Sequence, residues 1–201
     1  MQAPAPFRGA GPILLCLRLW RIHAKNQSGA CELRLERARA GVNSNFFMTP
    51  EAMRLLRLLI DVWLPDFKFG PGRCAQTLAC TPWYWETVTE NLRLIHDGGE
   101  DLTIRHLIMP NHVECCTAPV LAWIAEHMPD VPVNVMDQYH PDCFCDPRNS
   151  KYREQYAELA RRCTGQEIRS AYRHAHERGL SFESITFERA MLERGPIAPG
   201  I

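Results

Sequence analysis

The chain has 201 residues, of which 46% are hydrophobic, and it carries 23 basic and 23 acidic side chains. This length suits one ordinary domain or part of a larger one, and the apolar content is sufficient for a buried core. The formal net charge of zero gives no indication of a nucleic-acid or anionic-membrane partner. No apolar run approaches the ~18–20 residues that a membrane span needs. These totals favour a globular protein that binds neither nucleic acid nor membrane.

The cysteines are numerous for this length, and their odd number does not suit a secreted disulfide framework. The nine are Cys16, Cys31, Cys74, Cys80, Cys115, Cys116, Cys143, Cys145 and Cys163. The apolar segment at residues 11–20 is interrupted by Arg18 and has no small-residue cleavage site, so we do not interpret it as a signal peptide. We expect free thiols and a cytoplasmic protein.

Residues 1–42 contain no strand, cap or motif that predicts a folded unit, and we leave them unassigned as a poorly ordered or unrelated segment. The folded part is expected over residues 43–201. It opens with a polar turn, followed by Thr49 as a helix N-cap and Pro50 at the first helical position. These signals predict an amphipathic helix over residues 50–59, and an apolar run then predicts a strand over residues 62–66.

The same order of signals recurs along the rest of the chain. Thr81 and Pro82 predict the start of a helix that a glycine pair ends at residues 98–99. Strands are expected over residues 102–110 and 131–141, helices over residues 117–129, 149–163 and 164–179, and a short last strand over residues 181–188. This alternation predicts an α/β fold with a parallel sheet and crossover helices, either open or closed into a barrel.

Titratable residues stand at the ends of three predicted strands, namely Asp66, Arg105 and His140. In parallel α/β folds the carboxyl ends of the strands line the ligand site. Asp66 and Lys68 share a face of an extended chain, roughly 6–7 Å apart. They can therefore bind a ligand or simply pair with each other. Arg105 and His140 also have alternatives to ligand binding. Arg105 can form a salt bridge to a helix carboxylate, and His140 can be held by a hydrogen bond to a backbone carbonyl.

Four sequence blocks, "NSNFFM", "VWLPDFKFG", "IRHLIMPNHVECC" and "VNVMDQYHP", resemble the later half of radical S-adenosylmethionine (radical SAM) enzymes. The resemblance is to proteins related to the pyruvate formate-lyase activating enzyme. It implies a truncated, partial (β/α) barrel. In the intact family a C-x3-C-x2-C loop holds a [4Fe-4S] cluster, and S-adenosylmethionine bound to that cluster yields a 5′-deoxyadenosyl radical that abstracts hydrogen. Activating enzymes act in this way on a glycine of a protein substrate.

The resemblance also implies cofactor-binding positions, which are Asn43, Asn45, Asp66, Lys68, Arg105 and His140. S-adenosylmethionine carries a carboxylate and an ammonium group, so Lys68 or Arg105 can pair with the former and Asp66 with the latter. The family's turn begins with Asp where Asn43 stands, and this departure weakens the case for a cation site there. No catalytic residue is predicted.

The chain contains no C-x3-C-x2-C motif, so the [4Fe-4S] cluster has no anchor in this sequence. We expect the chain to be an incomplete radical SAM oxidoreductase that performs no radical chemistry alone. The alternative is a non-catalytic remnant or a zinc-binding module that uses soft side chains near the strand ends. Those are His112, Cys115, Cys116, His140, Cys143 and Cys145. The adjacency of Cys115 and Cys116 and the other spacings weigh against zinc. An incomplete barrel also predicts an exposed sheet edge and low solubility.

Overall fold

A computed structural model describes residues 40–183 of the chain. Most of the unassigned N-terminal segment, including Cys16 and Cys31, lies outside the described residues. So does the later part of the strand predicted over residues 181–188. None of the helices in the described part has the length and apolar character that a membrane crossing requires.

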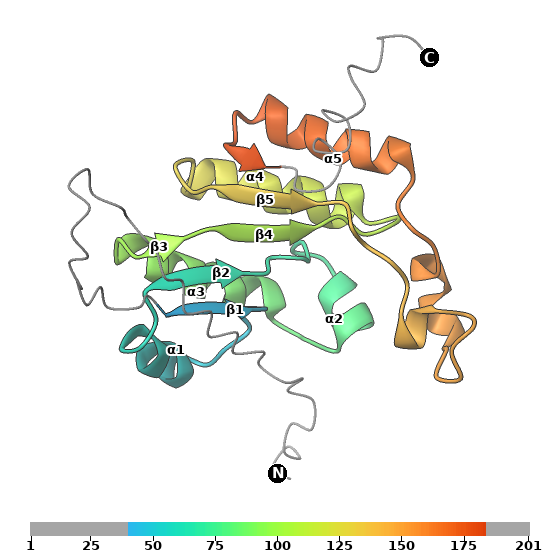
Figure 1. Cartoon of the computed structure of the whole chain (residues 1–201), viewed down its shortest axis with the longest axis horizontal. Helices are drawn as coiled ribbons and strands as arrows, with labels where there is room; N and C mark the ends of the chain where they lie inside the picture. The colour runs from blue at the N-terminus through green and yellow to red at the C-terminus, as the bar shows by residue number, and fades with distance from the viewer. Residues whose placement is uncertain (1–39, 184–201) are drawn as a thin grey trace, which may run out of the picture.

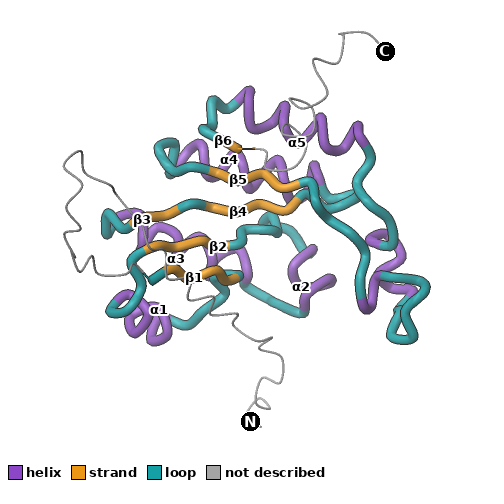
Figure 2. Tube along the Cα trace, in the orientation of Figure 1, coloured by secondary structure: helices purple, strands orange, loops and turns teal. Residues whose placement is uncertain are grey.

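The described residues contain six parallel strands (Figure 1). They are β1 (Gly41–Ser44), β2 (Val62–Pro65), β3 (Asp101–Leu102), β4 (Ile104–Leu107), β5 (Val133–Met136) and β6 (Phe182–Glu183). Hydrogen bonds define two three-stranded sheets, β1-β2-β3 and β4-β5-β6. A bridge between Asp66 and Arg105 connects them, so the strands form one continuous surface (Figure 2). The predicted parallel α/β fold is confirmed, and no closed barrel is seen in residues 40–183.

The two sheets meet between β3 and β4, where the hydrogen-bonding partner of the chain changes. Thr103 alone separates β3 from β4, and its N–H still donates to the Trp63 carbonyl of β2 at 3.0 Å. The next N–H, that of Ile104, donates instead to the Pro132 carbonyl beside β5, also at 3.0 Å. The chain therefore changes its hydrogen-bonding neighbour within two residues. β3 and β4 therefore form one nearly continuous line that joins the two sheets.

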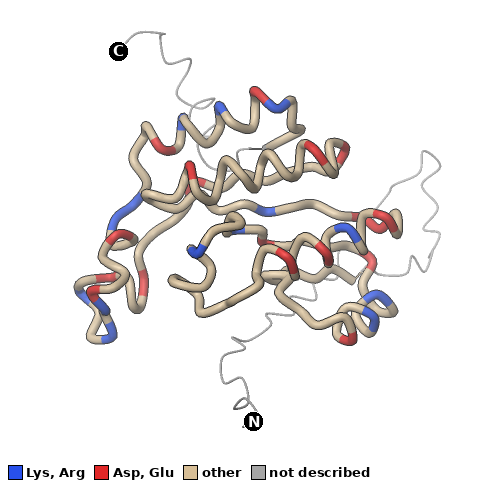
Figure 3. Tube along the Cα trace, turned by 180° about the vertical axis from the view of Figure 1, so that it is seen from behind, with Lys and Arg blue, Asp and Glu red and all other residues tan. Residues whose placement is uncertain are grey.

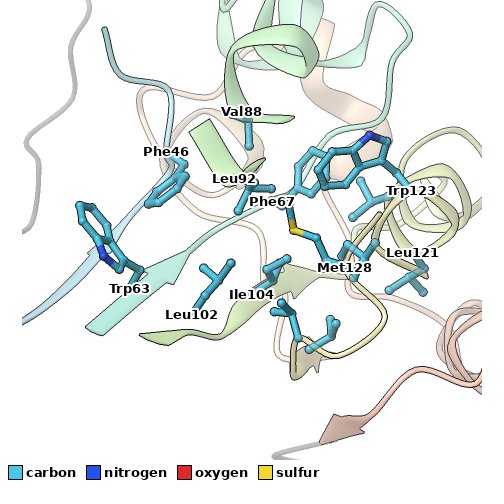
Figure 4. Packing of buried hydrophobic residues seen from close by; sticks show 14 of the residues in the cluster. Phe46, Trp63, Phe67, Val88, Leu92, Leu102, Ile104, Leu121, Trp123 and Met128 are labelled. Atoms are coloured by element: carbon cyan, nitrogen blue, oxygen red, sulfur yellow. The ribbon is translucent and has the colours of Figure 1, made fainter. Parts of the chain in front are cut away.

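Helices connect the strands, except that β3 passes directly into β4. The helices are α1 (Pro50–Arg57), α2 (Cys74–Ala79), α3 (Tyr84–Asp97), α4 (Ala118–His127) and α5 (Gly165–Glu177). Three shorter helical segments accompany them, a π-helix at Val113–Thr117 and 3-10 helices at Cys143–Cys145 and Glu154–Leu159. The main hydrophobic core lies where the helices pack on the sheet, as Figure 4 shows for Phe67 of the sheet side and Leu92 and Trp123 of the helices.

Alternate side chains of the strands lie on opposite faces of the sheet. Trp63 and Phe67 are fully buried in the core, whereas Leu64 and Asp66 between them are half-buried. The same alternation in β4 buries Ile104 and leaves Arg105 half-buried. The sheet thus has one face under the helices and a second face that is more open, and this second face carries the charged residues.

Two of the predicted helix starts are confirmed in detail. The Thr49 hydroxyl accepts a hydrogen bond from the Ala52 N–H at 3.3 Å, and Pro50 opens α1. Thr164 and Glu167 form a reciprocal capping box at the start of α5, a feature that satisfies two otherwise unpaired backbone donors. Both starts follow from local sequence alone.

Two predicted helices are wrong in their extent. α3 begins at Tyr84 after Trp83, which adopts φ 58°, and not at Pro82. Thr81 instead donates its hydroxyl hydrogen to the Ala75 carbonyl and so closes α2, a helix that was not predicted.

Residues 149–163 form turns and a 3-10 helix rather than the predicted α-helix. Asn149 Oδ1 accepts from the Lys151 N–H at 3.0 Å, a local bond that competes with helix formation. β1 begins at Gly41, within the segment left unassigned.

Candidate functional site

Three of the predicted site residues come together where β2 and β4 lie side by side. Asp66 follows the last residue of β2, and a parallel bridge pairs it with Arg105 of β4. Asp66 Oδ2 lies 3.0 Å from Lys68 Nζ, and Asp66 Oδ1 lies 3.4 Å from Arg105 Nε. One carboxylate is therefore shared by two cations on the open face of the sheet.

Backbone hydrogen bonds fix the position of this charged group. The Asp66 N–H donates to the Ser44 carbonyl at 2.7 Å, and the Phe67 N–H donates to the Arg105 carbonyl at 2.9 Å. The Tyr84 hydroxyl, which comes from the helix side, accepts from the Lys68 N–H and donates to the Asp66 carbonyl, both at 3.0 Å. Burial raises the pKa of Tyr84, so this hydroxyl stays protonated and able to donate.

The charges in this group do not balance. The Asp66 side chain is 15% exposed, and those of Arg105 and Lys68 are 24% and 31% exposed, so all three are partly removed from water. Asp66 Oδ1 is buried and has no hydrogen-bond partner, because the contact with Arg105 Nε lacks hydrogen-bond geometry. The group therefore keeps one excess positive charge and one free acceptor atom beside each other.

The other three predicted residues lie in different settings. Asn43 is half-buried in β1, opposite Leu64 of β2, and belongs to the open face by its place in the alternation. Asn45 is exposed, and its Oδ1 accepts from the Phe47 N–H at 3.2 Å within the turn after β1. His140 is exposed, beyond the end of β5. Within residues 40–183 no hydrogen bond or ion pair joins these three side chains to Asp66.

The prediction missed a polar row on β5 next to Arg105. Asn134 lies opposite Arg105 in the ladder, and its Oδ1 is buried without a hydrogen-bond partner. Arg105 Nη2 lies 3.7 Å from Met136 Sδ, and Gln138 Nε2 lies 3.3 Å from the same sulfur. The sequence "VNVMDQ" could have predicted this row, because Asn134, Met136 and Gln138 are spaced by two and therefore lie on one face of a strand.

A buried histidine lies on the helix side of the same strands. His106 of β4 is fully buried, with Nδ1 2.7 Å from the Phe67 carbonyl oxygen and Nε2 2.9 Å from Thr117 Oγ1. Burial, and to a smaller extent the Lys68 charge, lowers the pKa of His106 to about 4. The neutral ring donates from Nδ1 and accepts at Nε2, so it links the β2 end to the start of α4.

A second group of chemically active side chains lies beside the β2–α2 connection. It consists of Cys74, His112, Cys115 and Cys116, whose ligand atoms all lie within 4.8 Å of one another. Cys74 opens α2, and the other three lie at or just before the π-helix. Burial raises the pKa of the Cys115 and Cys116 thiols.

This thiol group differs from the set of side chains that the sequence offered as zinc ligands. His112, Cys115 and Cys116 belong to it, whereas His140, Cys143 and Cys145 do not. Cys74 was missed because it lies 41 residues before Cys115 in the chain. The adjacency of Cys115 and Cys116 does not keep the two thiols apart, since Cys115 Sγ and Cys116 Sγ lie 3.9 Å from each other.

Comparison with known proteins gives two similarities. No protein-family model matches the chain. The uncharacterized protein MJ0674 of Methanocaldococcus jannaschii is 38% identical over 138 residues, which are 69% of this chain and 38% of that protein. The chain thus spans well under half the length of this relative.

The structural comparison concerns the fold. The described structure is similar to a domain of pyruvate-formate lyase-activating enzyme from Bacteroides vulgatus, with a TM-score of 0.50 and 15% sequence identity. The similarity covers 73% of this chain and 81% of that domain. At this identity the comparison shows a shared fold, a parallel α/β arrangement of strands and helices.

Proposed function

We propose that residues 40–183 form the part of a radical SAM-type domain that binds the amino-acid end of S-adenosylmethionine. Asp66, Lys68 and Arg105 are the proposed binding groups. The sequence resemblance and the shared fold support the class of ligand, and the charged group on the open face supports the location. A cytoplasmic location and a protein substrate for the intact enzyme belong to the same proposal.

The single observation that carries this proposal is the unbalanced charge around Asp66. A zwitterionic amino acid supplies a carboxylate, which the excess cation of Lys68 and Arg105 attracts. The same ligand supplies an ammonium, which can donate to the free acceptor Asp66 Oδ1. Arg105 suits a carboxylate because its planar guanidinium can donate two parallel hydrogen bonds.

Neighbouring residues extend the proposed site along the open face. Asn43 and Asn134 lie on this face in β1 and β5, and Asn134 Oδ1 is a second buried acceptor without a partner. Both amides can bind polar groups of the ligand beyond its amino-acid end. Asn45 and His140 are further candidates through the sequence resemblance alone.

The iron–sulfur cluster of the family does not fit the residues of this chain. The sequence contains no C-x3-C-x2-C loop, and the cysteines that gather in residues 40–183 come from two separate segments. We therefore assign ligand binding to this chain and attribute no radical step to it.

Isothermal titration of the full chain with S-adenosylmethionine tests the proposal. The wild-type chain is expected to bind, and Arg105→Gln and Asp66→Asn are each expected to weaken binding by roughly 10- to 100-fold, as for the loss of one hydrogen bond to a charged group. Arg148→Gln is the matched control, because Arg148 forms a similar ion pair with Asp146 on the exposed surface.

S-adenosylhomocysteine shows which end of the ligand is bound. It keeps the amino-acid end but lacks the sulfonium charge, so it is expected to respond to Arg105→Gln in the same way. The proposal is wrong if wild-type chain binds neither compound, or if folded Arg105→Gln and Asp66→Asn chains bind as tightly as the control.

A further inference from the structure

The thiol group beside the β2–α2 connection has the geometry of a single-ion site. Cys74 Sγ lies 3.6 Å from Cys115 Sγ, Cys115 Sγ lies 3.9 Å from Cys116 Sγ, and His112 Nδ1 lies 3.3 Å from Cys115 Sγ. Two sulfur atoms bound to one tetrahedral zinc ion at about 2.3 Å each are about 3.8 Å apart. The observed separations match that value. A cluster of several irons would need its thiolates further apart, each on a different iron.

The π-helix explains how two adjacent cysteines reach one point. In a regular α-helix neighbouring residues point about 100° apart. In the π-helix Val113–Thr117 the turn is wider, and the His112 carbonyl accepts from both the Cys116 and the Thr117 N–H groups, at 2.9 and 3.2 Å. Single π-turns are rare and occur often at functional sites. This one places a histidine and two thiols on one side of the chain.

A neighbouring carboxylate supports the histidine as a ligand. His112 is 5% exposed, and its Nε2 is buried without a hydrogen-bond partner. Glu158 Oε1 lies 3.6 Å from this nitrogen. Metal-binding histidines usually present their second ring nitrogen to a carboxylate or carbonyl, which orients the ring. Nδ1 faces the thiols while Nε2 faces Glu158, which is the arrangement that a bound metal ion requires.

We propose that Cys74, His112, Cys115 and Cys116 bind one zinc ion in a tetrahedral Cys3His site. Soft thiolates with one imidazole suit zinc, and four protein ligands leave no open position, so the site is structural. The ion joins the start of α2 to the start of α4. The connection between β2 and α2, which includes Lys68, is thereby attached to the helix layer at a second point.

The experiment uses the full chain, purified anaerobically without chelator, and measures bound metals by mass spectrometry. One zinc per chain is expected, with little iron. X-ray absorption at the zinc edge should give three sulfur neighbours at about 2.3 Å and one nitrogen at about 2.0 Å. This readout needs no variant, so it remains decisive if a ligand substitution prevents folding.

Variants assign the ligands. Cys74→Ser and His112→Gln are expected to release zinc to a competing chelator far more readily than wild type, and Glu158→Gln is expected to weaken zinc binding by roughly 10-fold or more. Cys80→Ser is the control, because Cys80 lies at the other end of α2, outside the group.

Four results would overturn the proposal. These are a wild-type chain that takes up no zinc even when titrated, iron with acid-labile sulfide on these thiols, a Cys74–Cys115 disulfide in the anaerobic protein, and equal zinc loss in Cys80→Ser and Cys74→Ser. None of these results depends on S-adenosylmethionine binding, so this proposal and the proposed function fail separately.

Discussion

At the scale of single residues, the charged group shows what sequence reasoning can and cannot predict. Asp66 and Lys68 share a face because strand side chains alternate. Arg105 joins them although it is the second residue of β4 and not at the predicted strand end, because a parallel bridge pairs it with Asp66. Asn134, whose Oδ1 has no hydrogen-bond partner, follows from the same alternation on β5, yet it was missed because the sequence does not show that it lies opposite Arg105 in the ladder.

His106 makes the stability of the chain dependent on pH. The pKa of His106 is about 4 in the folded chain because burial disfavours the imidazolium, and it is near 6.5 in an unfolded one. Between these values the unfolded state binds a proton that the folded state does not. Stability is therefore expected to fall as the pH falls through this window, by about 2 kcal/mol between pH 7 and pH 5.

Urea unfolding of wild type and His106→Gln at several pH values measures this dependence. The variant is expected to be less stable at pH 7, since it loses the contacts with Phe67 and Thr117, but to show a shallower decline toward pH 5. Glu167, whose pKa is lowered chiefly by a hydrogen bond from Arg161, contributes equally to both chains and cancels in the comparison. Identical declines in the two proteins would contradict the assignment.

At the scale of elements, the helix starts at Thr49 and Thr164 were predictable because capping uses residues a few positions apart. The π-helix at Val113–Thr117 and the short helix α2 were not, because their conformations depend on packing between segments distant in sequence. The convergence of Cys74 with Cys115 has the same cause. Local signals thus predicted most of the strand and helix order, and tertiary contacts decided the thiol group.

Gly70 shows how closely the β2–α2 connection packs against the π-helix. A Cβ atom at Gly70 would overlap the Cys115 carbonyl oxygen and lie 2.9 Å from Pro119 Cγ, whereas one at Gly72 would meet nothing within 4 Å. Gly70→Ala is expected to lower the free energy of unfolding by about 1–3 kcal/mol, as overpacking does. Gly72→Ala is expected to change it by less than about 0.5 kcal/mol. Chemical denaturation of both variants tests this, and equal effects would refute the close packing.

At the scale of the whole molecule, basic and acidic residues are mixed over the helical side, as the view from behind shows (Figure 3). The opposite side of the sheet carries the candidate site, and β1 and β6 are the outer strands of the sheet within residues 40–183. The parallel strands with crossover helices were predictable from the alternation of elements. Whether the sheet closes into a barrel was not predictable, because the sequence pattern is the same for an open sheet and a barrel.

The described part of the chain exposes apolar surface that favours association. On and just after α1, the side chains of Leu55, Leu58 and Leu59 are 65%, 77% and 66% exposed, and outer strands offer unpaired backbone groups. We expect the chain to self-associate as its concentration rises in sedimentation experiments, and a Leu58→Lys, Leu59→Lys variant to associate less.

Leu94→Lys on α3 is the control for that variant, because Leu94 is only 37% exposed. A wild-type chain that stays monomeric at every concentration and unfolds cooperatively would contradict both this expectation and the interpretation as an incomplete barrel.

The hydroxyl group of Tyr84 has a consequence for how the two sides of the sheet communicate. One oxygen atom from the helix layer completes the hydrogen bonding of Asp66 and Lys68, whose side chains lie on the opposite face. A ligand that moves the backbone at Asp66 or Lys68 would therefore strain the hydrogen bonds to Tyr84 in the first turn of α3. Through this hydroxyl, the binding of a ligand on the open face would be coupled to the position of α3 on the helix side.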